Sequence, residues 1–208
     1  MKRRSFLVTG LAAWIGFGPS PGHALTTDEA RALVQATIDD ILGLVAANQS
    51  KAETAAALRK IIVARTAVDY IARFAAGRAW RTMSETQQSR FVDAFIDSVA
   101  NEYAGHFRRF EGEAGDLRKF VRIAGAEDAG RKGVLVRTNI LPTGETAISV
   151  DWLVSDRSGR VAVSDLVVEG ISMAITQREI IGGMLDVRDG DVEQLIADLI
   201  ARGEVSGD

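Results

Sequence analysis

Residues 148–168, ISVDWLVSDRSGRVAVSDLVV, decide the fold class because they contain two strand patterns and the turn between them. From Ile148 to Val154 every second side chain is apolar, which is the period of a strand with one buried face. The turn composition of residues 156–159 separates this segment from a second apolar, β-branched run. Two such runs with a short connection predict an antiparallel hairpin.

Two more strand patterns precede this hairpin. The segment FVRI at 120–123 is short and apolar, and the side chains of residues 134–139 alternate between two faces. Turn sequences at 130–133 and 142–145 separate the strands. We therefore expect a meander of four antiparallel strands.

The rest of the chain has helical periodicity. Ser84 and Gln87 form a capping box ahead of the clearest helix, whose apolar stripe recurs at intervals of four from Phe91 to Tyr103. Helical patterns also occupy residues 26–45, 51–63, 66–78, 174–187 and 189–202. Strands grouped after helices favour an α+β fold. We expect a curved four-stranded antiparallel sheet packed against a bundle of helices and enclosing an apolar pocket.

Residues 1–24 have the features of an export signal. A basic start at 2–4 precedes an apolar segment at 6–17, and Gly22 and Ala24 occupy the −3 and −1 positions of a cleavage site. The apolar segment is too short to span a bilayer. The pair Arg3-Arg4 before this segment is compatible with both the general secretory and the twin-arginine pathway, so the export route stays open. The expected division is a cleaved signal peptide at 1–24, a single domain at 25–203 and a flexible tail at 204–208.

The charge balance limits the classes of partner. The chain has 25 basic and 28 acidic residues, and loss of Lys2, Arg3 and Arg4 with the signal leaves a formal net charge of −6. This charge argues against nucleic acid as a partner and against tight electrostatic binding to anionic membranes. Cysteine is absent, which excludes disulfides, zinc–thiolate sites and thiol nucleophiles.

Catalytic motifs are also absent from the sequence. The chain has no nucleophile elbow, no phosphate-binding loop and no paired histidines for zinc. The candidates for acid–base chemistry are His106, Asp165 and Glu169. We interpret His106 as a surface or rim residue, Asp165 as an ion-pair partner or helix cap, and Glu169 as an outward-pointing side chain. We expect no enzyme activity, no metal and no cofactor.

Two segments resemble one known family. Residues 68–107 contain an apolar helix, the pair Trp80-Arg81, and a Ser-x-x-Gln start of a long helix with two phenylalanines and a late tyrosine. Residues 161–173, VAVSDLVVEGISM, carry an apolar strand, Asp, and Glu-Gly-x-Ser. Together they resemble the MlaC-type periplasmic phospholipid-binding proteins, also known as toluene- or organic-solvent-tolerance auxiliary proteins. Arg178 also matches the family, whereas Gln177 stands where the family often has an aromatic residue.

The resemblance implies a periplasmic lipid shuttle. Such proteins carry phospholipid between an outer-membrane lipoprotein complex and an inner-membrane ABC-transporter complex, and some relatives are associated with hopanoids. The acyl chains would lie between the curved sheet and the helices, with lipid as cargo and not as a cofactor. We expect a monomer. An exported interaction or scaffold protein with a filled core is the alternative, and a small hydrolase using His106, Asp165 and Glu169 is a more distant one.

A set of apolar side chains from the helical stripe, the sheet and the segment after it is expected to line the pocket. Methionine suits such a lining because its flexible thioether adapts to variable chains. The expected lipid-binding residues are Phe91, Phe95, Val99, Tyr103, Val136, Ile148, Val150, Trp152, Leu166, Val168, Ile171, Met173, Ile181 and Met184.

Overall fold

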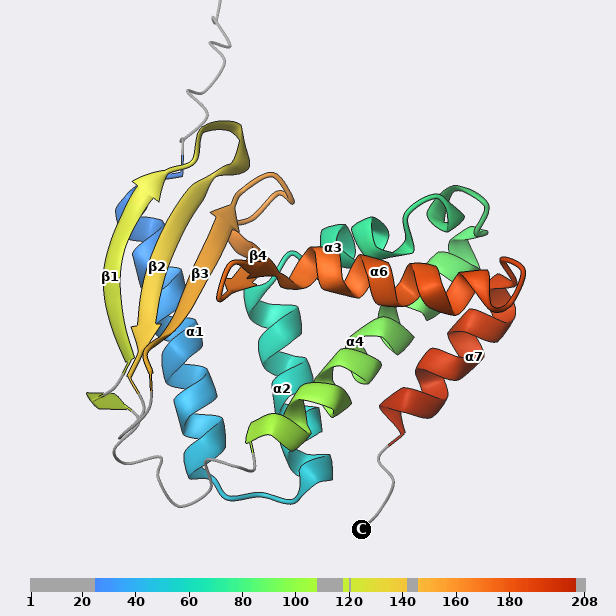
Figure 1. The fold of residues 1–208 in the computed structure, drawn as a ribbon, viewed down its shortest axis with the longest axis horizontal. Coiled ribbons are helices and arrows are strands. Elements are labelled where there is room, and N and C mark those ends of the chain that lie inside the picture. Colours follow the sequence, from blue (N-terminus) through green and yellow to red (C-terminus); the bar gives the residue numbers. More distant parts are fainter. Residues whose placement is uncertain (1–24, 108–117, 120, 142–145, 205–208) are drawn as a thin grey trace, which may run out of the picture.

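The computed structural model describes residues 25–107, 118–119, 121–141 and 146–204. Within these ranges the chain is α+β, with six α-helices and an open antiparallel sheet in the order β1-β2-β3-β4-β5 (Figure 1). The expected signal peptide at 1–24, the expected turn at 142–145 and residues 205–208 of the expected tail lie outside the described residues.

The sheet is a meander in which each strand pairs with the next along the chain. The expectation of four strands was wrong by one, because a two-residue strand follows β4. Glu169 and Gly170 both have positive φ, 50° and 81°, and the resulting tight turn folds β5 back along β4. Two residues show no periodicity, so the sequence pattern could not predict this strand. The strands are β1 Val121–Asp128, β2 Val134–Ile140, β3 Ile148–Ser155, β4 Ala162–Val168 and β5 Ile171–Ser172.

The hairpin of β3 and β4 contains an irregularity that matters for the buried face. Trp152 pairs with Leu166, but the register shifts between Leu153 and Val154, so that Val154 pairs with Val163. A shift of one residue moves side chains to the other face of a sheet. Val163 and Leu166 therefore both contribute to the same core, although their spacing of three would place them on opposite faces of a regular strand.

The helices begin with strong side-chain caps. Thr26 with Glu29 and Ser50 with Glu53 form complete capping boxes at the first two helices. The predicted capping box of Ser84 is confirmed, since its backbone N–H donates to Gln87 Oε1 at 2.8 Å and its Oγ accepts from the Gln87 N–H at 3.2 Å. The helices are α1 Thr27–Ala46, α2 Lys51–Arg65, α3 Val68–Ala76, α4 Glu85–Phe107, α6 Met173–Asp186 and α7 Val192–Gly203.

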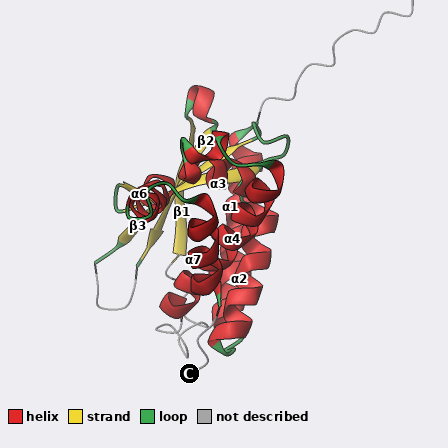
Figure 2. Cartoon of the chain, turned by 90° about the vertical axis from the view of Figure 1, so that its right-hand side faces the viewer, coloured by secondary structure: helices red, strands yellow, loops and turns green. Residues whose placement is uncertain are grey.

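The apolar side chains form two main cores, one on each side of the molecule. In the first, α1 packs across the inner face of the sheet, with Val34 and Val136 fully buried. In the second, α3, α4, α6 and α7 pack around Phe91 and Leu195. Helix α2 lies between the two cores (Figure 1). Helix α6 runs across the direction of α1 and α2, and Figure 2 looks along the axis of α6.

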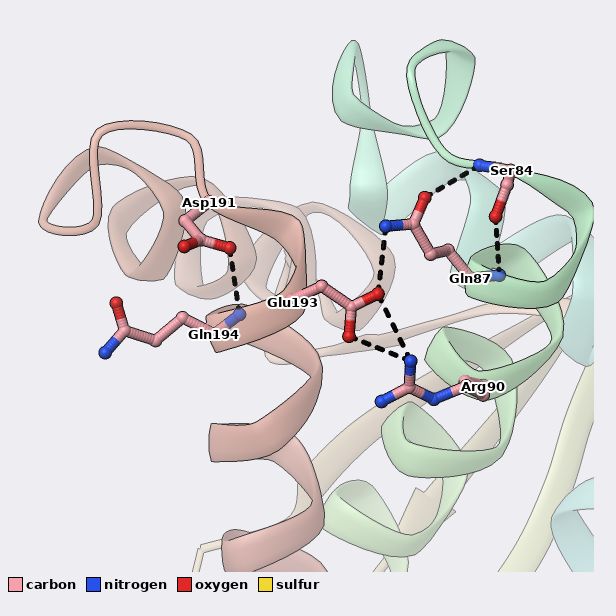
Figure 3. Close-up of polar contacts among 6 residues, drawn as sticks. All are labelled: Ser84, Gln87, Arg90, Asp191, Glu193 and Gln194. Atoms are coloured by element: carbon pink, nitrogen blue, oxygen red, sulfur yellow. Dashed lines mark hydrogen bonds and ion pairs between the residues drawn. The ribbon is translucent and has the colours of Figure 1, made fainter.

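A polar cluster ties the start of α4 to the start of α7 (Figure 3). Gln87 Nε2 donates to Glu193 Oε1 at 2.9 Å, and the Arg90 guanidinium lies 2.8 Å from Glu193 Oε2. Asp191 caps α7 by accepting from the Gln194 N–H at 3.1 Å. The Gln87 amide, followed by Arg90, lowers the pKa of the Glu193 carboxyl. The Arg90–Glu193 pair is exposed to solvent, so it contributes little to stability.

Candidate functional site

A cavity of about 210 Å³ lies between the two main cores. Helices α1, α2, α3, α4 and α6 surround it, and β3 and β4 form the remaining wall. Its lining is almost entirely apolar. The lining residues are Thr37, Ile41, Leu58, Ile61, Ile62, Thr66, Val68, Ile71, Phe95, Ile96, Val99, Tyr103, Trp152, Val163, Asp165, Leu166, Met173, Ala174 and Gln177.

The helices present one face each to this cavity. On α4, Phe95, Val99 and Tyr103 follow one another at intervals of four, so they lie in a row along the helix. On α2, Ile61 and Ile62 lie one turn beyond Leu58 and enter the same space. The apolar stripes that stabilise each helix in the fold therefore also form the walls of the cavity.

The junction of α2 and α3 is anchored to the β3–β4 hairpin. The Arg160 guanidinium donates to the backbone carbonyls of Val63, Ala64 and Thr66 at 2.6–2.8 Å, which satisfies carbonyls at the C-terminal end of α2. The N–H of Ala67 donates to Val163 O at 2.8 Å. These contacts hold the α2 and α3 walls against the strand wall.

Trp152 and Leu166 form the strand wall and lie directly opposite each other. The Trp152 indole N–H donates to Thr138 Oγ1 at 3.0 Å, and this hydroxyl donates to Val150 O at 2.8 Å. The side chains of Trp152, Thr138 and Val150 are all buried. Because the polar edge of the indole is satisfied within the sheet, the ring contributes an apolar surface to the cavity.

Most polar groups in the lining already have partners. The hydroxyls of Thr37 and Thr66 each donate at 2.8 Å to a carbonyl of the preceding helical turn. Asp165 Oδ2 accepts from Ser172 Oγ at 2.6 Å, and Oδ1 accepts from the Ala174 N–H at 3.0 Å. Asp165 therefore caps α6, which is one of the two roles expected for it from the sequence.

Gln177 differs from these residues. Its side chain is 7% exposed and lines the cavity, and its Nε2 has no hydrogen-bond partner within the described part of the chain. Close to it, the Tyr103 hydroxyl donates to the sulfur of Met173 at 3.5 Å. Burial raises the pKa of the Tyr103 phenol, the charge of Glu102 adds to the rise, and Gln177 opposes it.

Comparison with known proteins identifies the family. The family model described as MlaC protein matches residues 35–201, which is most of the chain.

The chain belongs to the MlaC family.

A search of curated protein sequences gave no match. Among solved structures, the chain is similar to a phospholipid-binding protein from Ralstonia solanacearum, determined in complex with a phospholipid. The two share 21% sequence identity with a TM-score of 0.67, over 84% of this chain and 96% of the other. At this identity the likeness shows a shared fold, and the family resemblance expected from the sequence is confirmed.

In this MlaC-family protein the expected lipid-binding residues fall into separate places. Six of them line the cavity: Phe95, Val99, Tyr103, Trp152, Leu166 and Met173. The others lie elsewhere: Phe91, Ile181 and Met184 in the helical core, Val136, Ile148, Val150 and Val168 in the core beneath α1, and Ile171 at the surface with 60% exposure. Helix α1 covers most of the inner face of the sheet, so little of that face reaches the cavity.

Several lining residues were not expected from the sequence. Leu58, Ile61 and Ile62 lie in the helical pattern expected at residues 51–63, but nothing in that pattern indicated which core α2 would face. For Gln177 a signal was present. Met173, Gln177 and Ile181 occupy equivalent positions at intervals of four, so Gln177 interrupts an apolar stripe with a polar side chain.

Other hollows lie outside this cavity, among them the following two. One, of about 460 Å³, is lined by Arg73, Arg78, Arg81 and Arg178 and lies on the face of α3 away from the cavity. Arg178 is held there by a 2.8 Å hydrogen bond to Phe74 O and by its position over the Phe74 ring. The other, of about 780 Å³, lies along the opposite face of the sheet and combines apolar and charged side chains.

The described ranges offer no metal site and no helix for a membrane span. No group of three or more His, Asp or Glu side chains there could hold a metal ion. No helix in the same ranges is long and apolar enough to cross a membrane. His106 lies at the end of α4, with its ring 5.9 Å from that of Tyr103.

Proposed function

We propose that this protein binds a phospholipid, or a related lipid such as a hopanoid, with the apolar part of the lipid in the cavity between the two cores. The observation that supports this proposal most strongly is the cavity, an apolar space where five helices and the sheet meet. Membership of the MlaC family and the fold shared with a phospholipid-binding protein support the assignment.

Apolar burial supplies the binding energy. Transfer of acyl chains from water contributes about 0.8 kcal/mol for each buried CH₂ group. Ten such groups would therefore contribute roughly 8 kcal/mol before the cost of ordering the chain. Binding and release of this kind require no catalytic group, so we propose a carrier without enzymatic activity or cofactor.

The cavity must widen to hold a lipid with two chains. Its volume of about 210 Å³ is below the range of roughly 300–1,000 Å³ that is typical of ligand pockets. Helix α2 contributes no side chain to either main core, so it could move away from the cavity without opening them. We propose that lipid shifts the protein from a narrow to a widened state by binding the widened state better.

We further propose that the protein is exported to the periplasm and shuttles lipid between outer-membrane and inner-membrane transport complexes as a monomer. The features behind this proposal are the signal sequence at 1–24 and the family. Cleavage after Ala24 predicts a mature protein beginning at Leu25, which mass spectrometry of protein purified from the periplasm would show.

Carriage can be tested with two populations of vesicles separated by a dialysis membrane that passes protein but not vesicles. Donor vesicles contain a fluorescent phospholipid, and acceptor vesicles contain none. We expect the fluorescent lipid to reach the acceptors when the protein is present and to remain in the donors when it is absent. Equal transfer with and without protein would contradict the proposed carrier function.

A further inference from the structure

Gln177 places a hydrogen-bond donor inside an otherwise apolar cavity. The side chain is more than nine-tenths buried, and its Nε2 has no partner among the described residues. Leaving a buried donor unpaired costs about 1–3 kcal/mol. Such a group is retained at a binding site when a ligand supplies the missing acceptor.

The charges around the cavity indicate which acceptor fits. Among the described lining residues Asp165 is the one ionisable carboxylate, and none is Lys, Arg or His. A phosphate group would therefore be buried without a cation and close to a negative charge, which is strongly unfavourable. The acceptor that reaches Gln177 must be uncharged.

Neighbouring polar groups do not compete for this acceptor. The hydroxyls of Thr37 and Thr66 donate within their own helices, and Tyr103 donates to Met173. Both oxygens of Asp165 accept bonds at the start of α6. The Gln177 amide interacts with the nearby Tyr103 oxygen and opposes the rise of its pKa, but no hydrogen bond of ordinary geometry joins the two. Among the described lining residues Gln177 is thus the donor that remains available to a ligand.

We propose that the Gln177 amide donates a hydrogen bond to an ester carbonyl oxygen of the bound lipid. This inference rests on the proposed lipid-binding function. An ester carbonyl is uncharged, is a good acceptor, and lies at the top of an acyl chain, between the apolar cavity and the solvated head group. The bond fixes how deep the chains enter, and it makes the protein selective for acyl esters over lipids without a carbonyl.

The test is a competition between dipalmitoyl phosphatidylethanolamine and its dihexadecyl ether analogue. The two have the same head group and equivalent chains, but the ether lacks both carbonyls. Delipidated protein is mixed with vesicles containing equal amounts of each, and native mass spectrometry measures which lipid is bound. We expect the wild type to prefer the ester roughly tenfold, as the loss of a hydrogen bond to a buried donor would predict.

The informative variant is Gln177→Met, which keeps the length of the side chain but removes the donor. We expect it to bind the ether analogue at least as well as the wild type and to lose the ester preference. The control is Thr176→Val, next to Gln177 on α6 but outside the cavity lining, whose hydroxyl donates to Ser172 O at 3.0 Å. It should keep the ester preference.

A stability measurement separates this role from a structural one. If Gln177 serves the lipid, the lipid-free Gln177→Met protein should melt at the same temperature as the wild type or higher, because an unpaired polar group has been removed. A clearly lower melting temperature, or equal binding of ester and ether by the wild type, would overturn the inference. If the wild type bound neither the ester nor the ether lipid, that result would instead contradict the proposed function.

Discussion

Thr138 shows how one buried hydroxyl can support a wall of the cavity. It accepts from the Trp152 indole and donates to Val150 O, and it is 1% exposed. We expect Thr138→Val, which preserves shape, to lower the free energy of unfolding by about 1–3 kcal/mol because the indole N–H loses its partner. Thr37→Val, which removes a bond within one helix, should cost less than about 1 kcal/mol. Equal losses in urea unfolding would contradict this account of the strand wall.

Tyr103 provides a second test at a single residue. Burial is the main cause of its raised pKa, so the neutral phenol is favoured in the folded protein. Its contribution to stability is therefore complete below the pKa of an unfolded tyrosine and is lost as the pH rises through the higher folded value. The difference in tyrosinate absorbance between the wild type and Tyr103→Phe gives the titration of this residue.

Lipid binding should raise the pKa of Tyr103 further. We expect a midpoint above the ordinary tyrosine value in lipid-free protein and a still higher one after loading with phospholipid, because the lipid adds to the burial. A midpoint at or below the ordinary value would show that the Tyr103 phenol is solvated and is not buried at the cavity.

Among the elements, the strands and helices with a long pattern were predictable. The alternation in β3 and the four-residue stripe of α4 each reflect one buried face, which the sequence displays directly. The shift at Val154 and the two-residue strand β5 were not predictable, because both depend on local backbone geometry and not on a repeated pattern. For the same reason the sequence indicated only some of the residues that line the cavity. Periodicity indicates that Phe91 and Phe95 are buried, but not that Phe95 also lines the cavity whereas Phe91 does not.

The turn between β1 and β2 offers a test of an element that the sheet requires. Gly133 has φ +110°, and a Cβ added there would collide with the carbonyl oxygen of Val154 in the neighbouring strand. Gly133→Ala should therefore lower stability by at least about 3 kcal/mol. Gly130 lies in the same turn with φ +62° and open space around it, so Gly130→Ala should cost only about 1 kcal/mol. Similar melting temperatures for the two variants would contradict the close packing at Gly133.

For the whole molecule, the arrangement of two cores around one cavity explains stability and binding together. Each core has its own fully buried side chains, so the cavity between them is not needed to hold the fold together. A larger side chain that fills the cavity should therefore abolish lipid binding and leave the fold intact. The sequence could not show this division, because it depends on how α1 and α2 pack against the sheet.

Val99→Trp tests this separation. Val99 lines the cavity from α4, and an indole there would occupy much of the space of about 210 Å³. We expect the variant to keep its circular dichroism spectrum and to lose most of its bound lipid. Val63→Trp is the control, since Val63 is 41% exposed on α2 and should leave lipid loading unchanged. Unchanged loading in Val99→Trp would place the lipid elsewhere.

Native mass spectrometry tests most directly whether the cavity holds lipid. The mature protein would be purified from the periplasm without detergent and its mass compared with that of the polypeptide. We predict an excess that equals one phospholipid or related lipid and that disappears in Val99→Trp. A wild-type mass equal to the polypeptide alone, unchanged after incubation with phospholipid vesicles, would contradict the account.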